Sequence, residues 1–225
     1  MKGLLIKDWY QLKEIKRLIV VMVLVCFFLF IGNGGEGNSI SFIFGYLMIM
    51  MSMMAVMTIG YDEMNNGFPF LMTFPVTRKQ YVIEKYILGI LLLLLGWIFG
   101  MVLSIGNEML NTPKAESPLV ILLQGVIFFA VGLLFMSVSM PIQLKMGGEK
   151  GRIVAVLILM ALTVAFVLGG RVLGKAAPEV LQKILKNMNV FMSGNFFIPV
   201  VAAVAALFVI LSAFISVRIM EKKEF

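Results

Sequence analysis

Six long runs of apolar residues constrain what this chain can fold into. They cover residues 18–32, 40–60, 86–105, 119–144, 153–170 and 196–217, and none contains Asp, Glu, Lys or Arg. A helix needs roughly 20 apolar residues to cross the hydrocarbon core of a bilayer, so only the first run is short. With 61% hydrophobic and 14% charged residues, the chain has too little polar surface to cover a soluble globule. We therefore expect an all-α integral membrane protein with six transmembrane helices in a single domain, residues 1–225.

The distribution of Lys and Arg predicts which helix ends face the cytoplasm, because cytoplasmic loops carry the excess of these residues. The two terminal segments and the loops 61–85 and 145–152 together hold 14 of the 19 Lys and Arg residues. The alternate loops hold five, four of them in residues 171–195. We expect both termini to be cytoplasmic and residues 171–195 to be outside. The net charge of +7 is then a topology signal and does not indicate nucleic acid binding.

The stretch "GGRVLGKA", Gly169 to Ala176, resembles the phosphate-binding P-loop of nucleotide hydrolases. A P-loop has Ser or Thr after its Lys to hold magnesium, and here Ala176 follows Lys175. A P-loop also follows a strand of a soluble domain, whereas this stretch follows an apolar run and lies at the predicted outer surface. We expect no ATP binding there.

The residues needed for chemistry inside the membrane are missing from the sequence. There is no His and one Cys, Cys26, so the usual ligands for a zinc or haem site are lacking. Ion-coupled transporters generally place carboxylates or broken helices at mid-membrane, and hydrolases need a general base or a metal. We expect no metal site, no cofactor and no enzyme activity in this chain.

Two segments outside the apolar runs have helical amphipathic patterns. In residues 1–17, Leu5, Trp9 and Leu12 share one helical face, opposite Lys7 and Asp8. This pattern predicts a helix lying in the inner membrane interface, with Trp9 as an anchor; the alternative is a simple extension of the first span. Residues 177–188 have a similar pattern and predict a short outer amphipathic helix before the last span.

The loop 61–85 has an apolar centre between charged flanks. Its prolines, Pro69 and Pro75, bracket a short helical piece, and Thr77 is placed to cap the helix that begins near Arg78. Free loops in water seldom concentrate aromatic residues, so we interpret the segment as a surface that binds a partner; the alternative is contact with lipid headgroups. The candidate docking residues are Asp62, Glu63, Phe68, Phe70, Leu71, Met72, Phe74, Pro75, Arg78 and Lys79.

The second apolar run is rich in methionine, a flexible residue that recurs on surfaces that bind varied apolar partners. Two interpretations stay open: a wall facing a lipophilic cargo, and ordinary packing between helices. The candidate cargo-facing residues are Met50, Met53, Met54 and Met57.

Taken together, the six spans, the two amphipathic helices and the apolar inner loop resemble the ABC type-2 exporter permease family. The stretch "YDEMNNG", Tyr61 to Gly67, is similar to the acidic, Gly-ended start of that family's inner loop. "TFPVTRKQYVIEKY", Thr73 to Tyr86, is similar to its Leu-Pro-Val-Ser-Arg-Lys-like motif, with Phe74 in place of Leu and Thr77 in place of Ser. Within the family, the chain looks most like the permease of a phenol-soluble-modulin or lantibiotic-type peptide exporter.

The resemblance implies a half-transporter in a bacterial cytoplasmic membrane. It would pair with a second permease chain and with two cytoplasmic ATPase subunits, which would bind ATP and magnesium. The piece from Phe68 to Phe74 would be the coupling helix, seated in a groove of the ATPase, and the cargo would be an amphipathic peptide. Two alternatives from other functional classes are an ATP-independent transporter or channel, and a membrane scaffold for peptide immunity or sensing.

Overall fold

A computed structural model describes residues 2–14, 16–32, 37–63, 67–71, 73, 75–110, 118–147 and 197–223, together with residues 150, 151, 153, 154, 156–158, 160, 161, 164 and 168. Within these residues the only regular secondary structure is helix, which confirms the all-α prediction. The helices with defined bounds are α1 (Lys2–Glu14), α2 (Lys16–Gly32), α3 (Gly37–Glu63), α4 (Gly67–Leu71), α5 (Arg78–Leu110), α6 (Pro118–Met146) and α9 (Phe197–Glu221).

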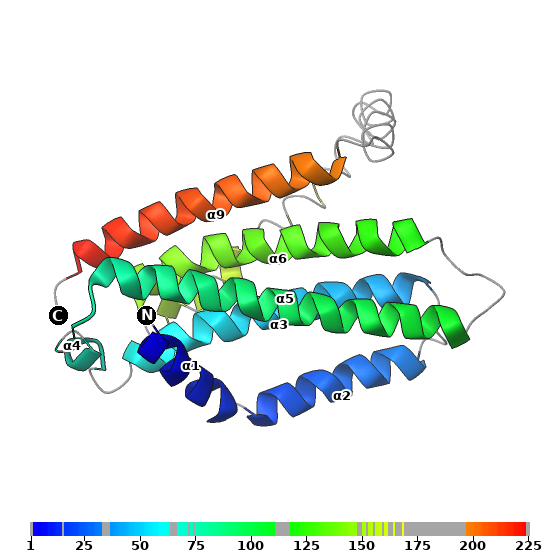
Figure 1. The fold of residues 1–225 in the computed structure, drawn as a ribbon, viewed down its shortest axis with the longest axis horizontal. Coiled ribbons are helices and arrows are strands. Elements are labelled where there is room, and N and C mark those ends of the chain that lie inside the picture. Colours follow the sequence, from blue (N-terminus) through cyan, green and yellow to red (C-terminus); the bar gives the residue numbers. More distant parts are fainter. Residues whose placement is uncertain are drawn as a thin grey trace.

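Four long helices, α3, α5, α6 and α9, run side by side along the longest axis of the molecule, and α2 flanks them (Figure 1). The short helices α1 and α4 lie at one end, close to the last turns of α3 and α9 and the first turns of α5. We call this end, where α1, α3, α4, α5 and α9 meet, the charged end of the bundle.

The four long helices are each long and apolar enough to cross a membrane. Helix α2 has 17 residues and is about 26 Å long at 1.5 Å per residue, shorter than a typical hydrocarbon core. Half of the predicted fifth span, residues 153–170, falls outside the described residues, and the predicted outer helix, residues 177–188, falls outside them entirely. The structure therefore supports four of the six predicted spans by length and composition.

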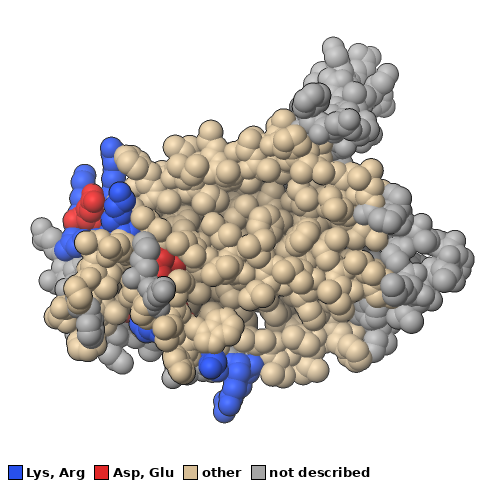
Figure 2. Space-filling model, viewed as in Figure 1, with Lys and Arg blue, Asp and Glu red and all other residues tan. Residues whose placement is uncertain are grey.

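The core of the bundle lies between α3, α5 and α6, where Phe44, Met48 and Leu93 are fully buried. The outward faces are also apolar, as lipid contact requires. In Figure 2 the middle of the molecule is free of Lys, Arg, Asp and Glu, and these residues gather at the charged end of the bundle. A further basic patch lies near the junction of α1 and α2, where Lys16 and Arg17 are exposed.

Polar side chains inside the bundle link the long helices. The Tyr86 hydroxyl of α5 lies 2.5 Å from Ser212 Oγ and 2.9 Å from Ser216 Oγ of α9. Ser52 Oγ of α3 donates to the Gly132 carbonyl of α6 at 3.0 Å. In lipid, water does not compete for such groups, so these hydrogen bonds hold neighbouring helices together.

The loop between the second and third long apolar runs is shorter than the predicted 61–85, because α3 continues to Glu63 and α5 begins at Arg78. Thr77 caps α5 as predicted: Gln80 N donates to Thr77 Oγ1 and Thr77 N donates to Gln80 Oε1, both at 3.2 Å. This reciprocal pair satisfies two of the backbone N–H groups that a helix start leaves without partners.

Candidate functional site

Two lysines and two aspartates form a closed ring of opposite charges at the charged end of the bundle. Lys7 and Asp8 come from α1, Asp62 from the last turn of α3, and Lys85 from α5. Lys7 Nζ pairs with Asp8 Oδ1 at 3.0 Å and with Asp62 Oδ1; Lys85 Nζ pairs with Asp62 Oδ2 at 2.8 Å and with Asp8 Oδ2. Each lysine therefore contacts both aspartates, and we call these four residues the charge ring.

The charge ring is buried. The side chains of Asp8 and Lys85 are 0% exposed, that of Asp62 is 1% exposed, and only Lys7 reaches solvent, at 29%. Burial lowers the pKa of the Lys7 ammonium, but the Asp62 and Asp8 carboxylates raise it by more, so its pKa lies above the ordinary value. At neutral pH, Lys7 is a fixed positive charge.

Neutral donors and acceptors complete the contacts of the ring. Tyr81 OH donates to Asp62 Oδ2 at 2.9 Å, and Gln11 Nε2 donates to Asp62 Oδ1 at 3.0 Å. Lys85 Nζ also donates to Thr58 Oγ1 at 3.1 Å. Asp62 thus accepts from α1 and α5 at once and links both helices to α3, in addition to the direct pair between Asp8 of α1 and Lys85 of α5.

A third carboxylate, Glu84, is buried beside the ring. It is 1% exposed, and neither of its oxygens has a hydrogen-bond partner among the described residues. The site therefore brings three acidic side chains together with two ammonium groups. Buried charges are tolerated only when paired, so the ring, which balances two carboxylates against two ammonium groups, is sensitive to the loss of either ammonium.

Helix α4 is anchored to the bundle through Phe68, its one buried residue. The Phe68 ring packs edge-on against Tyr81, with 5.4 Å between ring centroids, and Lys223 Nζ lies 5.0 Å from the Phe68 centroid on another side. Lys223 also pairs with Glu63 at 2.5 Å and donates to the Leu144 carbonyl at 3.0 Å. The chain segment after α9 therefore helps to fix α4.

Backbone geometry at Gly67 fixes how α4 leaves α3. A Cβ atom added to Gly67 would overlap the backbone carbonyl of Asp62, which has no freedom to move aside. At the other end of α4, Thr73 Oγ1 and Thr73 N both donate to the Phe70 carbonyl, at 2.7 and 3.1 Å. Pro69 lies in the first turn of α4, where a helix does not need its N–H.

The predicted docking residues divide into two groups. Phe70 is 66% exposed, and Pro75 and Lys79 are also exposed. Phe68 is buried and Leu71 is half-buried, while Met72 and Phe74 lie outside the described residues.

Three of the four charged residues predicted for docking bind other residues of this chain, and exposed Lys79 is the exception. Asp62 joins the charge ring, and Glu63 pairs with Lys223. Arg78 Nη1 donates to the carbonyls of Met220 and Glu221, at 3.1 and 2.6 Å, where it caps the end of α9. Asp62, Glu63 and Arg78 therefore stabilise the part of the bundle next to α4.

A family model described as ABC-2 family transporter protein matches residues 3–221 of this chain. The chain belongs to the ABC-2 transporter family. A comparison with curated proteins finds no match. The family establishes the chain as a multi-pass membrane component of an ABC transporter, a transport component that is not itself catalytic.

In this ABC-2 permease, α1 is oriented differently from the predicted amphipathic pattern. Leu12 is buried and Leu5 half-buried, whereas Trp9 is 52% exposed, and its role as an interface anchor stays a prediction. Asp8 was expected on the face opposite Leu5 and Trp9, and the structure instead buries it in the charge ring. Asp8 and Lys7 face the bundle because Lys85 and Asp62 offer them partners of opposite charge, so the inward face of α1 holds Asp8 together with Leu12. Trp9 and Tyr10 remain exposed.

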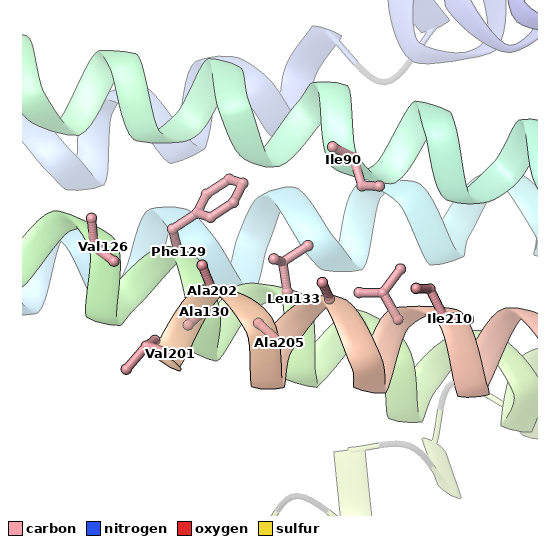
Figure 3. A pocket seen from close by; sticks show the side chains of 11 residues that line it. Ile90, Val126, Phe129, Ala130, Leu133, Val201, Ala202, Ala205 and Ile210 are labelled. Atoms are coloured by element: carbon pink, nitrogen blue, oxygen red, sulfur yellow. The ribbon is translucent and has the colours of Figure 1, made fainter. Parts of the chain in front are cut away.

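The methionines of α3 lie mainly within the bundle of this permease. Met54 is buried in the core, whereas Met50, Met53 and Met57 are half-buried. A cavity of about 330 Å³ lies elsewhere, between α5, α6 and α9, and its lining is entirely apolar (Figure 3). Its walls include Ile90, Phe129, Leu133, Ala202, Ala205 and Ile210.

The sequence-based prediction missed the residues that organise this site: Lys7, Asp8, Tyr81, Glu84, Lys85 and Lys223. One signal for Lys85 is present in the sequence. Tyr81, Lys85, Leu88 and Leu92 recur at helical spacing, which places Lys85 on the buried stripe of α5 and not on its water-facing side. A lysine on a core stripe needs a buried carboxylate, and that requirement points toward Asp8 and Asp62.

Proposed function

We propose that this chain is the permease subunit of an ATP-driven exporter in a bacterial cytoplasmic membrane. It pairs with a second permease chain and with two cytoplasmic ATPase subunits, which bind and hydrolyse ATP with magnesium. The main support for the proposal is that α4 is anchored in the bundle by Phe68 on one side and exposes Phe70 on the other.

This arrangement suits transmission of movement from a partner. An exposed aromatic residue on a fixed element is the usual form of an interface anchor, because little conformational entropy is lost on binding. We expect Phe70 to enter a groove of the ATPase, so that closure of the two ATPases moves α4. The four long helices then switch between inward-open and outward-open arrangements.

The cargo we propose is an amphipathic or hydrophobic peptide, of the phenol-soluble-modulin or lantibiotic kind. The long apolar helices carry no charged side chain in their middle portions, and the cavity between α5, α6 and α9 is lined by apolar groups. Such surfaces favour apolar side chains and repel ions. The half-buried residues Met50, Met53 and Met57 offer an adaptable surface of the same kind.

The experiment is purification of the tagged chain from native membranes in mild detergent, followed by identification of the proteins that remain bound. We expect an ATP-binding subunit with the wild-type chain and a loss of about 30-fold or more in its affinity for Phe70→Ala, as for an interface anchor worth about 2 kcal/mol. Phe28→Ala is the matched control, because Phe28 is 76% exposed on α2, away from the charged end. If no ATPase binds an intact wild-type chain, the proposal fails.

A further inference from the structure

Asp62 connects two structures at the charged end of the bundle: the charge ring, which includes α1, and the anchor of α4. It pairs with Lys7 and Lys85 in the ring and accepts the Tyr81 hydroxyl at 2.9 Å. The ring of the same Tyr81 packs against Phe68 of α4 at 5.4 Å. A continuous series of contacts therefore runs from Asp8 in α1, through Lys85, Asp62 and Tyr81, to Phe68.

The contacts of this series fix the position of the Tyr81 hydroxyl. Tyr81 is fully buried and its OH donates to Asp62, so the position of the Asp62 carboxylate sets the orientation of the Tyr81 ring. Asp62 is in turn placed by the ammonium groups of Lys7 and Lys85. A shift of α1 that withdraws Lys7 or Asp8 changes the charges around Asp62, and this change reaches Phe68 through one aromatic contact.

A buried ring of charges is an expensive way to join three helices. Well-packed apolar residues of similar volume often hold a fold as well or better, and buried ion pairs are best attested where they select one arrangement out of several. Here the ring has a defined geometry, in which each lysine contacts both aspartates, so loss of one charge leaves two opposite charges without one of their partners. These are the properties of a contact with two discrete states, joined and separated.

We propose that α1 is a positioning element for the coupling helix, and that the charge ring is the device by which α1 holds α4 in place. Asp8 and Lys85 are the positioning residues. The inference rests on the proposed function for its biological meaning: α1, α3 and α4 would move together when the ATPases close, and α1 would carry that movement along the inner membrane surface.

The first experiment uses the permease alone, in lipid nanodiscs. Cys26 is the only cysteine, so Cys26→Ala gives a background in which a spin label is attached at one chosen site. Phe70→Cys places the label on α4, and Lys13→Cys, in a second protein, places it on the exposed face of α1. The perturbation is Asp8→Asn, which removes one charge of the ring and nearly keeps the side-chain volume.

We expect Asp8→Asn to increase the mobile fraction of the label at both positions, by about tenfold on α4, which corresponds to about 1.4 kcal/mol. The control is Lys16→Ala, which removes an exposed charge beside α1 and should leave both spectra unchanged. The inference is overturned if only the α1 label becomes mobile, since α1 would then be an independent surface helix. It is also overturned if neither label responds.

A milder variant keeps the test decisive if Asp8→Asn does not fold. Gln11→Ala removes only the 3.0 Å hydrogen bond from α1 to Asp62 and leaves all four ring charges in place. The α4 label should then respond in the same direction but by less, about threefold, because one neutral donor to Asp62 is lost while all four ring charges remain. An unchanged α4 label in Gln11→Ala would contradict the inference.

The second experiment uses the complex with its ATPase. Asp8→Asn should still co-purify with the ATPase, because Phe70 is intact, but export per ATP hydrolysed should fall. If no ATPase binds either protein, the proposed function fails while the spin-label result still decides the role of the charge ring. If the ATPase binds and the yield of export per ATP is unchanged, the positioning role of Asp8 is refuted.

Discussion

Replacement of Lys85 by methionine is the most informative single change at the charge ring. Met is close to Lys in length and shape, so Lys85→Met removes the ammonium group without opening a cavity. Lys85 Nζ pairs with Asp8, lies 2.8 Å from Asp62 Oδ2, and donates to Thr58 at 3.1 Å. After the change, Asp8, Asp62 and the buried Glu84 face Lys7 as the one remaining ammonium group of the ring.

The magnitude follows from this loss of balance. Removal of one partner from a buried ion pair typically costs about 3–5 kcal/mol, because the other charge is left uncompensated. In a chain of this size each kcal/mol lowers the unfolding temperature by about 2–4 °C, so we expect a decrease of about 6–20 °C. The double variant Asp8→Asn/Lys85→Met removes one charge of each sign. It should be more stable than Lys85→Met alone, with a coupling energy of about 1–3 kcal/mol.

The assay is the fraction of protein that remains monodisperse after heating in detergent, measured by size-exclusion chromatography at a fixed heating rate. A fixed rate is required because membrane proteins often unfold irreversibly. Lys79→Met is the matched control, since Lys79 is exposed and lies in the same helix. A Lys85→Met protein within 2 °C of the control, or a double variant that shows additive losses, would refute the account of the ring as a mutually compensating unit.

Two further predictions concern residues next to the ring. Gly67→Ala should displace α4 and destabilise the chain by about 1–3 kcal/mol, because its Cβ would overlap the Asp62 carbonyl. Gly3→Ala is the control, since Gly3 has open space around it and its replacement should not destabilise the chain. Equal rates of limited proteolysis between α3 and α5 in the two variants would contradict this prediction. Glu84→Gln should raise the unfolding temperature by an amount equivalent to about 1–3 kcal/mol, because it replaces a buried acidic group, whose oxygens have no hydrogen-bond partner among the described residues, with a neutral amide. The exposed Glu221→Gln is its control, and a Glu84→Gln protein less stable than that control would show that the Glu84 carboxylate is itself required.

The parts of the site that depend on local sequence were predictable. Thr77 caps α5 because a hydroxyl residue followed three positions later by Gln is a recognisable helix start. A short helix in this loop was predictable from its aromatic residues and prolines, but its bounds were not: α4 spans Gly67–Leu71, so Pro69 lies within its first turn and the two prolines do not bracket it. Which aromatic residue would be buried was not predictable, since Phe68 and Phe70 have the same chemistry, and only the place of Tyr81 in the folded chain distinguishes them.

The charge ring depends on contacts between residues far apart in the chain. Asp8 and Lys85 are separated by 77 positions, and Lys7 and Asp62 by 55. A count of Lys and Arg per loop treats such residues as surface charges and serves only to predict orientation. It gives no information about which charges will pair, because pairing depends on how α1 folds back onto α3 and α5.

The separation of charge from the apolar middle of the bundle has a mechanistic consequence. Movement of a charge into hydrocarbon is expensive, so an ionic contact that opens and closes during a transport cycle is least costly near the end of the bundle, where headgroups and water can solvate the separated charges. The buried contacts of the middle region, such as Tyr86 with Ser212, are neutral and can exchange partners without that cost. The ionic contacts of this permease therefore lie at one end of the bundle, where they can open at least cost, and the helices that cross the membrane are held together by neutral packing.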